Sequence, residues 1–138
     1  MFKEIIQPRF AETDALGHIN NATLPVWFEQ SRRPIFKIFV PSLQPHDWNL
    51  ILAKVEVEYT AELFYGEQVT VMTAVKSIGN SSIQVYQEAW QGGRKAAKGT
   101  ATMVHFDHQK KTSVSIPNDI RQTLQIHHVE NCDFTSQM

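Results

Sequence analysis

Residues able to do chemistry gather near the start of the chain, in the run RFAETDALGHINNATLPVWFEQSR at positions 9–32. A carboxylate stands first, and a turn of small and polar residues follows it: Asp14, then Gly17, His18, Asn20 and Asn21. An acid placed just before a helix lies near main-chain N–H groups, which carry partial positive charge and can bind a developing oxyanion. These residues predict hydrolysis of an activated acyl group without a metal or a cofactor.

The composition of the whole chain limits the possible classes of protein. The 138 residues are 42% hydrophobic and 20% charged, which is typical of one globular domain with a real core. The net charge of -1 gives no electrostatic reason to expect a nucleic-acid partner. The single Cys132 cannot form an internal disulfide, so we expect a reducing, cytoplasmic location. The start, MFKEIIQPRF, lacks the apolar core of a signal peptide, and no stretch is long enough to span a membrane.

The elements that must position the site follow from the spacing of apolar residues. Positions 2–10 predict a short strand, and the small and polar residues at 11–21 predict a loop. Apolar residues then fall at helical spacing over 22–38, and Pro34 should kink or split this helix. We expect one domain over residues 1–128, followed by a polar tail over residues 129–138.

Strands dominate the rest of the chain. Alternation and short turns predict strands at 51–59, 68–78, 82–90 and 95–106, with a short helix at about 118–125. In the first strand the alternation puts one set of residues on one side: Ile51, Ala53, Val55, Val57 and Tyr59. These elements predict an α+β fold, in which an antiparallel sheet of five to six strands wraps around one long central helix. Such a sheet has an open edge, so pairing with a second copy is expected.

The motif resembles the signature of the 4-hydroxybenzoyl-CoA thioesterase-like family, the hotdog-fold acyl-CoA thioesterases. The matching residues are Arg9, Glu12, Thr13, Asp14, Gly17, His18, Ile19, Asn20, Asn21, Phe28, Glu29 and Arg32. Further matches lie downstream at Glu58-Tyr59, Gly66-Glu67 and Ile116-Pro117, so the resemblance covers residues 3–125. It departs from the family pattern at Leu24, where many relatives carry an aromatic residue, and at Pro25. Both departures lie near the expected acyl pocket and bear on the substrate more than on the reaction.

The resemblance implies a hotdog homodimer or homotetramer with active sites at the dimer interface. It also implies that Asp14 is the nucleophile or general base, and that the N–H at the helix start near Asn21 polarises the thioester carbonyl. The residues expected to contact the substrate are Asn20, Leu24, Trp27, Phe28 and Tyr59. CoA enters as part of the substrate, and no cofactor or metal is expected.

Each residue of the motif could instead have a purely structural role. Asp14 could serve only as a turn cap. As a catalyst it could attack the thioester to give a mixed anhydride or activate water, and the sequence does not separate these routes. Gly17 supplies backbone freedom, and for His18 bracing of the loop is favoured over a base paired with Asp14. Asn20 and Asn21 should shape the turn, with the Asn21 N–H facing the thioester oxygen.

Other polar residues of the chain have weaker claims to a functional role. Glu29, on the helix, is the second-choice catalytic acid, and a salt bridge with Arg32 or Arg33 is at least as favoured. Glu12 is expected to be exposed to solvent. The pair His105 and His108 lacks further ligands, so a metal site there is disfavoured. Basic residues near strand ends are candidates for contacts with CoA phosphates, with solvated turns as the favoured alternative for each: Arg94, Lys95, Lys98, Lys110 and Lys111.

The sequence therefore predicts a thioester hydrolase that releases a free acid and CoA. One alternative is a thioesterase that acts on acyl carrier protein, which would need a basic surface around the site. Another is a non-catalytic hotdog protein that binds acyl-CoA. A hydratase is disfavoured, because its motif sets Asp and His five positions apart with Asn and Pro between them, whereas Asp14 and His18 are four apart.

Overall fold

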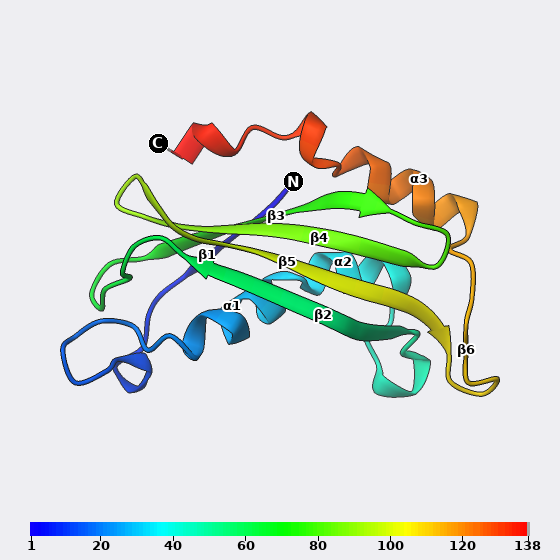
Figure 1. Cartoon of the computed structure of the whole chain (residues 1–138), viewed down its shortest axis with the longest axis horizontal. Helices are drawn as coiled ribbons and strands as arrows, with labels where there is room; N and C mark the ends of the chain where they lie inside the picture. The colour runs from blue at the N-terminus through cyan, green and yellow to red at the C-terminus, as the bar shows by residue number, and fades with distance from the viewer. Residues whose placement is uncertain (138) are drawn as a thin grey trace.

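The computed structural model describes residues 1–137, and Met138, at the end of the predicted tail, lies outside the described residues. An antiparallel sheet curls around two consecutive helices (Figure 1). The strands are β1 (Phe2–Ile6), β2 (Leu50–Tyr59), β3 (Val69–Ile78), β4 (Ser82–Gln91), β5 (Arg94–Asp107) and β6 (Thr112–Ser113). The helices are α1 (Thr23–Ser31), α2 (Arg33–Phe39) and α3 (Asn118–Ile126). The order β1-β3-β4-β5-β2, with β6 beside the end of β5, leaves β1 and β2 at the two edges.

The central helix is divided as its proline predicts. α1 ends at Ser31, Arg32 forms the junction, and Pro34 lies in the first turn of α2. Proline has no N–H to continue the helical ladder and its ring crowds the preceding turn, so it is tolerated best where a new helix starts. The split therefore turns one expected helix into two short ones along the same side of the sheet.

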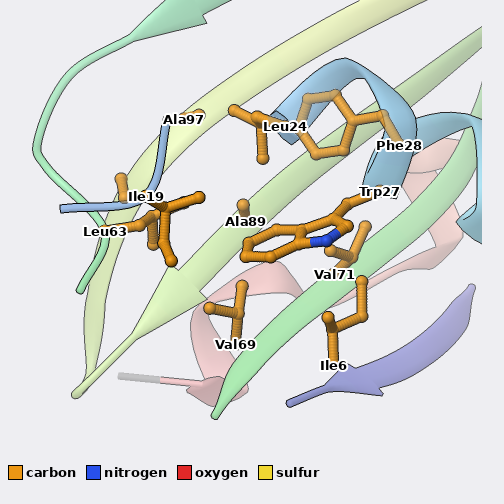
Figure 2. Packing of buried hydrophobic residues seen from close by; sticks show 11 residues of the cluster. Ile6, Ile19, Leu24, Trp27, Phe28, Leu63, Val69, Val71, Ala89 and Ala97 are labelled. Atoms are coloured by element: carbon orange, nitrogen blue, oxygen red, sulfur yellow. The ribbon is translucent and has the colours of Figure 1, made fainter. Parts of the chain in front are cut away.

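The apolar face of α1 forms the core at one end of the sheet. Figure 2 shows the Trp27 indole lying among aliphatic side chains from β1, β3 and β4. The side chains of Trp27 and Phe28 are only 2% and 1% exposed. The cluster around them comprises Ile6, Ile19, Leu24, Leu63, Val69, Val71, Ala89, Ala96 and Ala97. Burial of this much apolar surface is the main force that fixes the start of α1 against the sheet.

A buried polar network joins α1 to the sheet. Arg32 Nη1 donates to Gln87 Oε1 at 3.2 Å, and Gln87 Nε2 donates to the Phe28 carbonyl at 2.8 Å. Burial lowers the pKa of Arg32, and the charge of Glu29 opposes this effect. Within residues 1–137 neither Arg32 nor Arg33 forms an ion pair, so the expected salt bridge of Glu29 with one of them is not made.

The alternation predicted for the first long strand is wrong in its first half. The register of β2 against β5 shifts between Leu52 and Lys54, which marks a β-bulge. The extra residue changes the phase of the strand, so Leu50 is buried in the core while Ile51 is 37% exposed. Val57 still packs against the core and Tyr59 still reaches the helix start.

The C-terminal segment lies beside the part of β3 that β1 does not pair with. Leu124 of α3 packs in the second core cluster with Ile35 and Phe39 of α2. Beyond α3 the Val75 N–H donates to the His127 carbonyl, and the Phe134 ring packs edge-on against Tyr86. The proposed boundary at residue 128 stays a prediction. Among the described helices, none is long and apolar enough to cross a membrane.

Gly99 on β5 lies directly under the Phe28 ring. A Cβ at this position would lie 2.9 Å from Phe28 Cε2 and 3.0 Å from the Glu56 carbonyl oxygen. We expect Gly99→Ala to lower the free energy of unfolding by about 1–3 kcal/mol, because neither an aromatic ring in a packed core nor a strand backbone can move freely. Urea unfolding measures this change, and a variant as stable as the wild type would contradict the described packing.

Candidate active site

A cavity of about 550 Å³ lies where the loop after β1 meets the start of α1 and the end of β2. Most residues that the sequence singled out line it. The lining residues are Asp14, His18, Ile19, Asn20, Asn21, Leu24, Tyr59, Ala61, Glu62 and Leu63. The fold therefore brings the motif together with the segment that follows β2.

The two carboxylate oxygens of Asp14 have different surroundings. Oδ1 accepts hydrogen bonds from the N–H groups of Leu16 at 2.7 Å and His18 at 3.1 Å, so it shapes the turn as a cap does. Gly17 in that turn has a φ of 80°, a left-handed conformation that glycine adopts without strain. Oδ2 accepts no hydrogen bond from the described residues and lies 3.9 Å from His18 Nδ1. One oxygen of the acid is thus structural and the other is free to react.

The asparagine pair leaves one main-chain donor free. Asn20 uses its side chain to accept from the Ala22 N–H and its carbonyl to accept from the Thr23 N–H, both at 2.9 Å. The Tyr59 hydroxyl donates to the carbonyl of Asn21 and ties the end of β2 to the helix start. The Asn21 N–H has no acceptor among the described residues. This N–H, at the positive end of α1, is available to a substrate oxygen.

His18 is held by residues that the motif does not contain. Its Nε2 lies 3.0 Å from Glu62 Oε2, and its ring packs edge-on against Phe64 with centroids 5.1 Å apart. Ile19 N–H donates to the Leu63 carbonyl beside it. Glu62 was missed from the sequence, because an acidic residue in a polar turn carries no signal of its own until the fold brings it to His18.

Two predicted substrate contacts lie beneath the cavity. Trp27 and Phe28 are not among its lining residues, and both belong to the core. Trp27 Nε1 donates to Glu12 Oε2 at 2.9 Å, so the indole supports the loop from below. Leu24 and Tyr59 do line the cavity, as predicted. A substrate contact for Trp27 or Phe28 stays a prediction.

The expectation that Glu12 is solvent-exposed is wrong. Its side chain is 10% exposed and accepts from the Arg9 N–H as well as from Trp27. Burial alone would raise the pKa of Glu12, but the hydrogen bonds from Arg9 and Trp27 outweigh it, so the pKa is lowered from 4.5. Glu12 therefore anchors the start of the loop in its ionised form.

Other residues considered from the sequence lie away from this cavity. Glu29 lines a separate cavity with Arg32 and Phe36. His105 Nδ1 lies 3.2 Å from the Ser115 carbonyl oxygen, and His108 packs on Phe106. Within residues 1–137, no group of three or more His, Cys, Asp and Glu side chains is placed to hold a metal ion. Lys95 and Lys98 form ion pairs with acidic side chains of the sheet, Glu88 and Glu58.

Ionised Glu12 should contribute pH-dependent stability. Because its pKa is lower in the folded chain, this contribution is present above the ordinary value of 4.5 and is lost as the pH falls through the lowered value. We expect Glu12→Gln to lower the free energy of unfolding more at about pH 7 than at about pH 3. Trp27→Phe, which removes one of the donors, should weaken the same pH dependence. An equal effect of Glu12→Gln at both pH values would contradict this anchor.

Comparison with known proteins agrees with the geometry. The family model of the thioesterase-like superfamily matches residues 8–124. A structure described as a predicted thioesterase from Bacillus stearothermophilus is 43% identical, with a TM-score of 0.89 over 92% of this chain and 96% of that one. A thioesterase from Thermus thermophilus, complexed with coenzyme A and Zn, is 26% identical, with a TM-score of 0.80 over 89% of this chain and 90% of that one.

A curated relative is also similar. The uncharacterized protein YsmA of Bacillus subtilis (strain 168) is 25% identical over 120 residues, which cover 86% of this chain and 82% of that protein. These matches confirm both the resemblance and the fold that the motif predicted. The chain adopts the hotdog fold and belongs to the thioesterase-like superfamily.

Proposed function

We propose that this chain hydrolyses acyl-CoA thioesters to a free acid and CoA in the cavity beside Asp14. One observation carries the proposal. Asp14 and Asn21 line the same cavity, and among the described residues neither Asp14 Oδ2 nor the Asn21 N–H has a hydrogen-bond partner. A nucleophile or base beside a main-chain donor is the minimum that acyl transfer needs. Membership of the superfamily and the coenzyme A bound by the Thermus thermophilus thioesterase support CoA as the carrier.

The proposed chemistry divides between these two groups. Asp14 Oδ2 either attacks the carbonyl carbon to form a mixed anhydride or removes a proton from the attacking water. Negative charge then develops on the carbonyl oxygen, and the Asn21 N–H donates to it from the positive end of α1. The Tyr59 hydroxyl donates to the carbonyl of Asn21, on the peptide that follows this N–H, and so ties the helix start to the end of β2.

The cavity lining favours CoA over a protein carrier. Its apolar wall, formed by Leu24, Ala61 and Leu63, suits an acyl group. The charged residues that line it are the acids Asp14 and Glu62, beside His18, and Arg94 Nη2 lies 3.4 Å from the Glu62 carbonyl oxygen, so the lining itself is not the extended basic surface that an acidic carrier protein would need. The proposal therefore places acyl-CoA ahead of acyl carrier protein as the substrate class. A cytoplasmic location stays a prediction.

A second copy of the chain is proposed to pair along β2. This edge strand exposes apolar side chains, among them Leu52, Val55 and Tyr59, which are 48%, 42% and 48% exposed. If two copies pair antiparallel with Val55 at the symmetry axis, Lys54 of each faces Glu56 of the other. Such pairing would cover the free edge and bring the second copy close to Tyr59 in the cavity.

The hydrolase activity is tested by following free thiol release from short, long and aromatic acyl-CoAs. We expect Asp14→Asn to lower kcat by about a hundredfold or more, since the amide is neither a nucleophile nor a base. Asp119→Asn, on the exposed first turn of α3, is the matched control and should keep wild-type kcat. Binding of acyl-CoA without turnover by the wild type would instead support a non-catalytic binding protein.

The pairing is tested by measuring the molar mass in solution by light scattering. We expect a dimer for the wild type and a shift to monomer for Val55→Arg, because two like charges would meet at the symmetry axis. Val26→Arg changes a valine that is 60% exposed on α1 and should stay dimeric. A monomeric wild type, or a dimeric Val55→Arg variant, would contradict pairing along β2.

A further inference from the structure

The imidazole of His18 lies between two carboxylates from different parts of the chain. Its Nε2 is 3.0 Å from Glu62 Oε2, and its Nδ1 is 3.9 Å from Asp14 Oδ2. All three residues line the same cavity. An acid, an imidazole and a second acid in a row is the arrangement that orients a histidine for proton transfer.

The position of His18 is fixed by its surroundings. Its N–H donates to Asp14 Oδ1 and its carbonyl accepts from the Asp14 N–H at 2.7 Å. The residue also forms a β-bridge with Phe64, whose ring packs against the imidazole. With the backbone held and the Phe64 ring in an edge contact with the imidazole, the remaining freedom is rotation of the imidazole about its side-chain bonds. Glu62 Oε2 lies 3.0 Å from Nε2 as an ion-pair contact, and in this orientation Nδ1 lies 3.9 Å from Asp14 Oδ2.

We propose that Glu62 is a positioning residue. Its carboxylate pairs with the Nε2–H of His18, which leaves Nδ1 unprotonated, so that Nδ1 takes up and passes on the proton in the reaction. This inference rests on the proposed thioester hydrolysis. Hydrogen bonds to a charged acceptor are the strong ones, and a carboxylate on the far nitrogen stabilises the imidazolium that forms. Glu62 itself does not touch the reacting atoms, so its effect passes through His18.

The proton balance of the nucleophile route shows what His18 must do. Asp14 Oδ2 bonds to the carbonyl carbon, the C–S bond breaks, and CoA leaves as a thiolate. Water then adds to the anhydride, its proton passes to Nδ1 of His18, and the bond between the acyl carbon and Asp14 breaks. The Nδ1–H finally protonates the thiolate, so that one thioester and one water give one acid and one thiol. On the general-base route the same nitrogen passes on the proton that Asp14 removes from water.

A double-mutant cycle in kcat tests the role of Glu62. We expect Glu62→Ala to lower kcat about ten- to a hundredfold and to change KM less than about twofold, since the lost interaction serves the chemical step. In a His18→Asn background the same change should have no further effect, because Glu62 acts only through the imidazole. Glu58→Ala is the matched control: Glu58 is 64% exposed against 63% for Glu62, and it too forms one ion pair, with Lys98.

Two results would overturn the proposal while leaving the hydrolase activity intact. One is a kcat for Glu62→Ala equal to that of Glu58→Ala. The other is an equal loss in the His18→Asn background, which would mean that Glu62 acts on the substrate or the fold.

A readout independent of turnover is the proton resonance of His18 Nε2–H. We expect it to be protected from exchange in the wild type and in Glu58→Ala, and lost in Glu62→Ala. Its absence from the wild type would overturn the positioning role, whereas absence of turnover with the resonance present would overturn the proposed hydrolase and the catalytic use of His18.

Discussion

The hydrogen bond from the Trp27 indole to Glu12 connects the core to the loop that carries the candidate site. Trp27 is held by the sheet through burial of a large apolar ring, so its N–H has a fixed position. The Glu12 carboxylate accepts a hydrogen bond from this N–H and another from the Arg9 N–H, so the first turn of the loop is fixed relative to Trp27. The other end of the loop is held by a separate long-range hydrogen bond, from the Ile19 N–H to the Leu63 carbonyl, so the bond between Trp27 and Glu12 is what ties the start of the loop to the core. The geometry at Asp14 is therefore set by the same packing that builds the fold.

The short loop is rigid because many of its polar atoms bond to one another, and a few polar atoms without a partner among the described residues can contact a substrate. Asp14 uses Oδ1 for the turn and keeps Oδ2 free, and Asn20 satisfies two donors of the helix start. The donor that remains is the Asn21 N–H, and the Tyr59 hydroxyl donates to the carbonyl of the same residue, on the following peptide. A site built in this way needs little rearrangement when charge develops, which is the property that makes electrostatic stabilisation effective.

The features that were predictable from the sequence are those that depend on neighbouring residues. Pro34 predicts the helix split because the missing N–H acts within its own helix, and Gly17 and Asn20 predict the turn for similar local reasons. The bulge in β2 depends on how that strand pairs with β5. The alternation of residues within one strand holds no information about this pairing.

The rest of the site depends on contacts between distant segments. The approach of Glu62 to His18 joins the loop before α1 to the turn after β2. Helical spacing also groups Trp27 and Phe28 with Leu24, although only Leu24 lines the cavity, because periodicity identifies an apolar face but not which part of it is covered.

The roles proposed for Asp14 and Asn21 are tested most directly by a crystal structure with a non-hydrolysable acyl-CoA analogue in which a methylene group replaces the sulfur. If these roles are correct, the carbonyl carbon will lie within about 3.5 Å of Asp14 Oδ2 and the carbonyl oxygen about 3 Å from the Asn21 nitrogen. An analogue bound with its carbonyl away from both groups would contradict these roles.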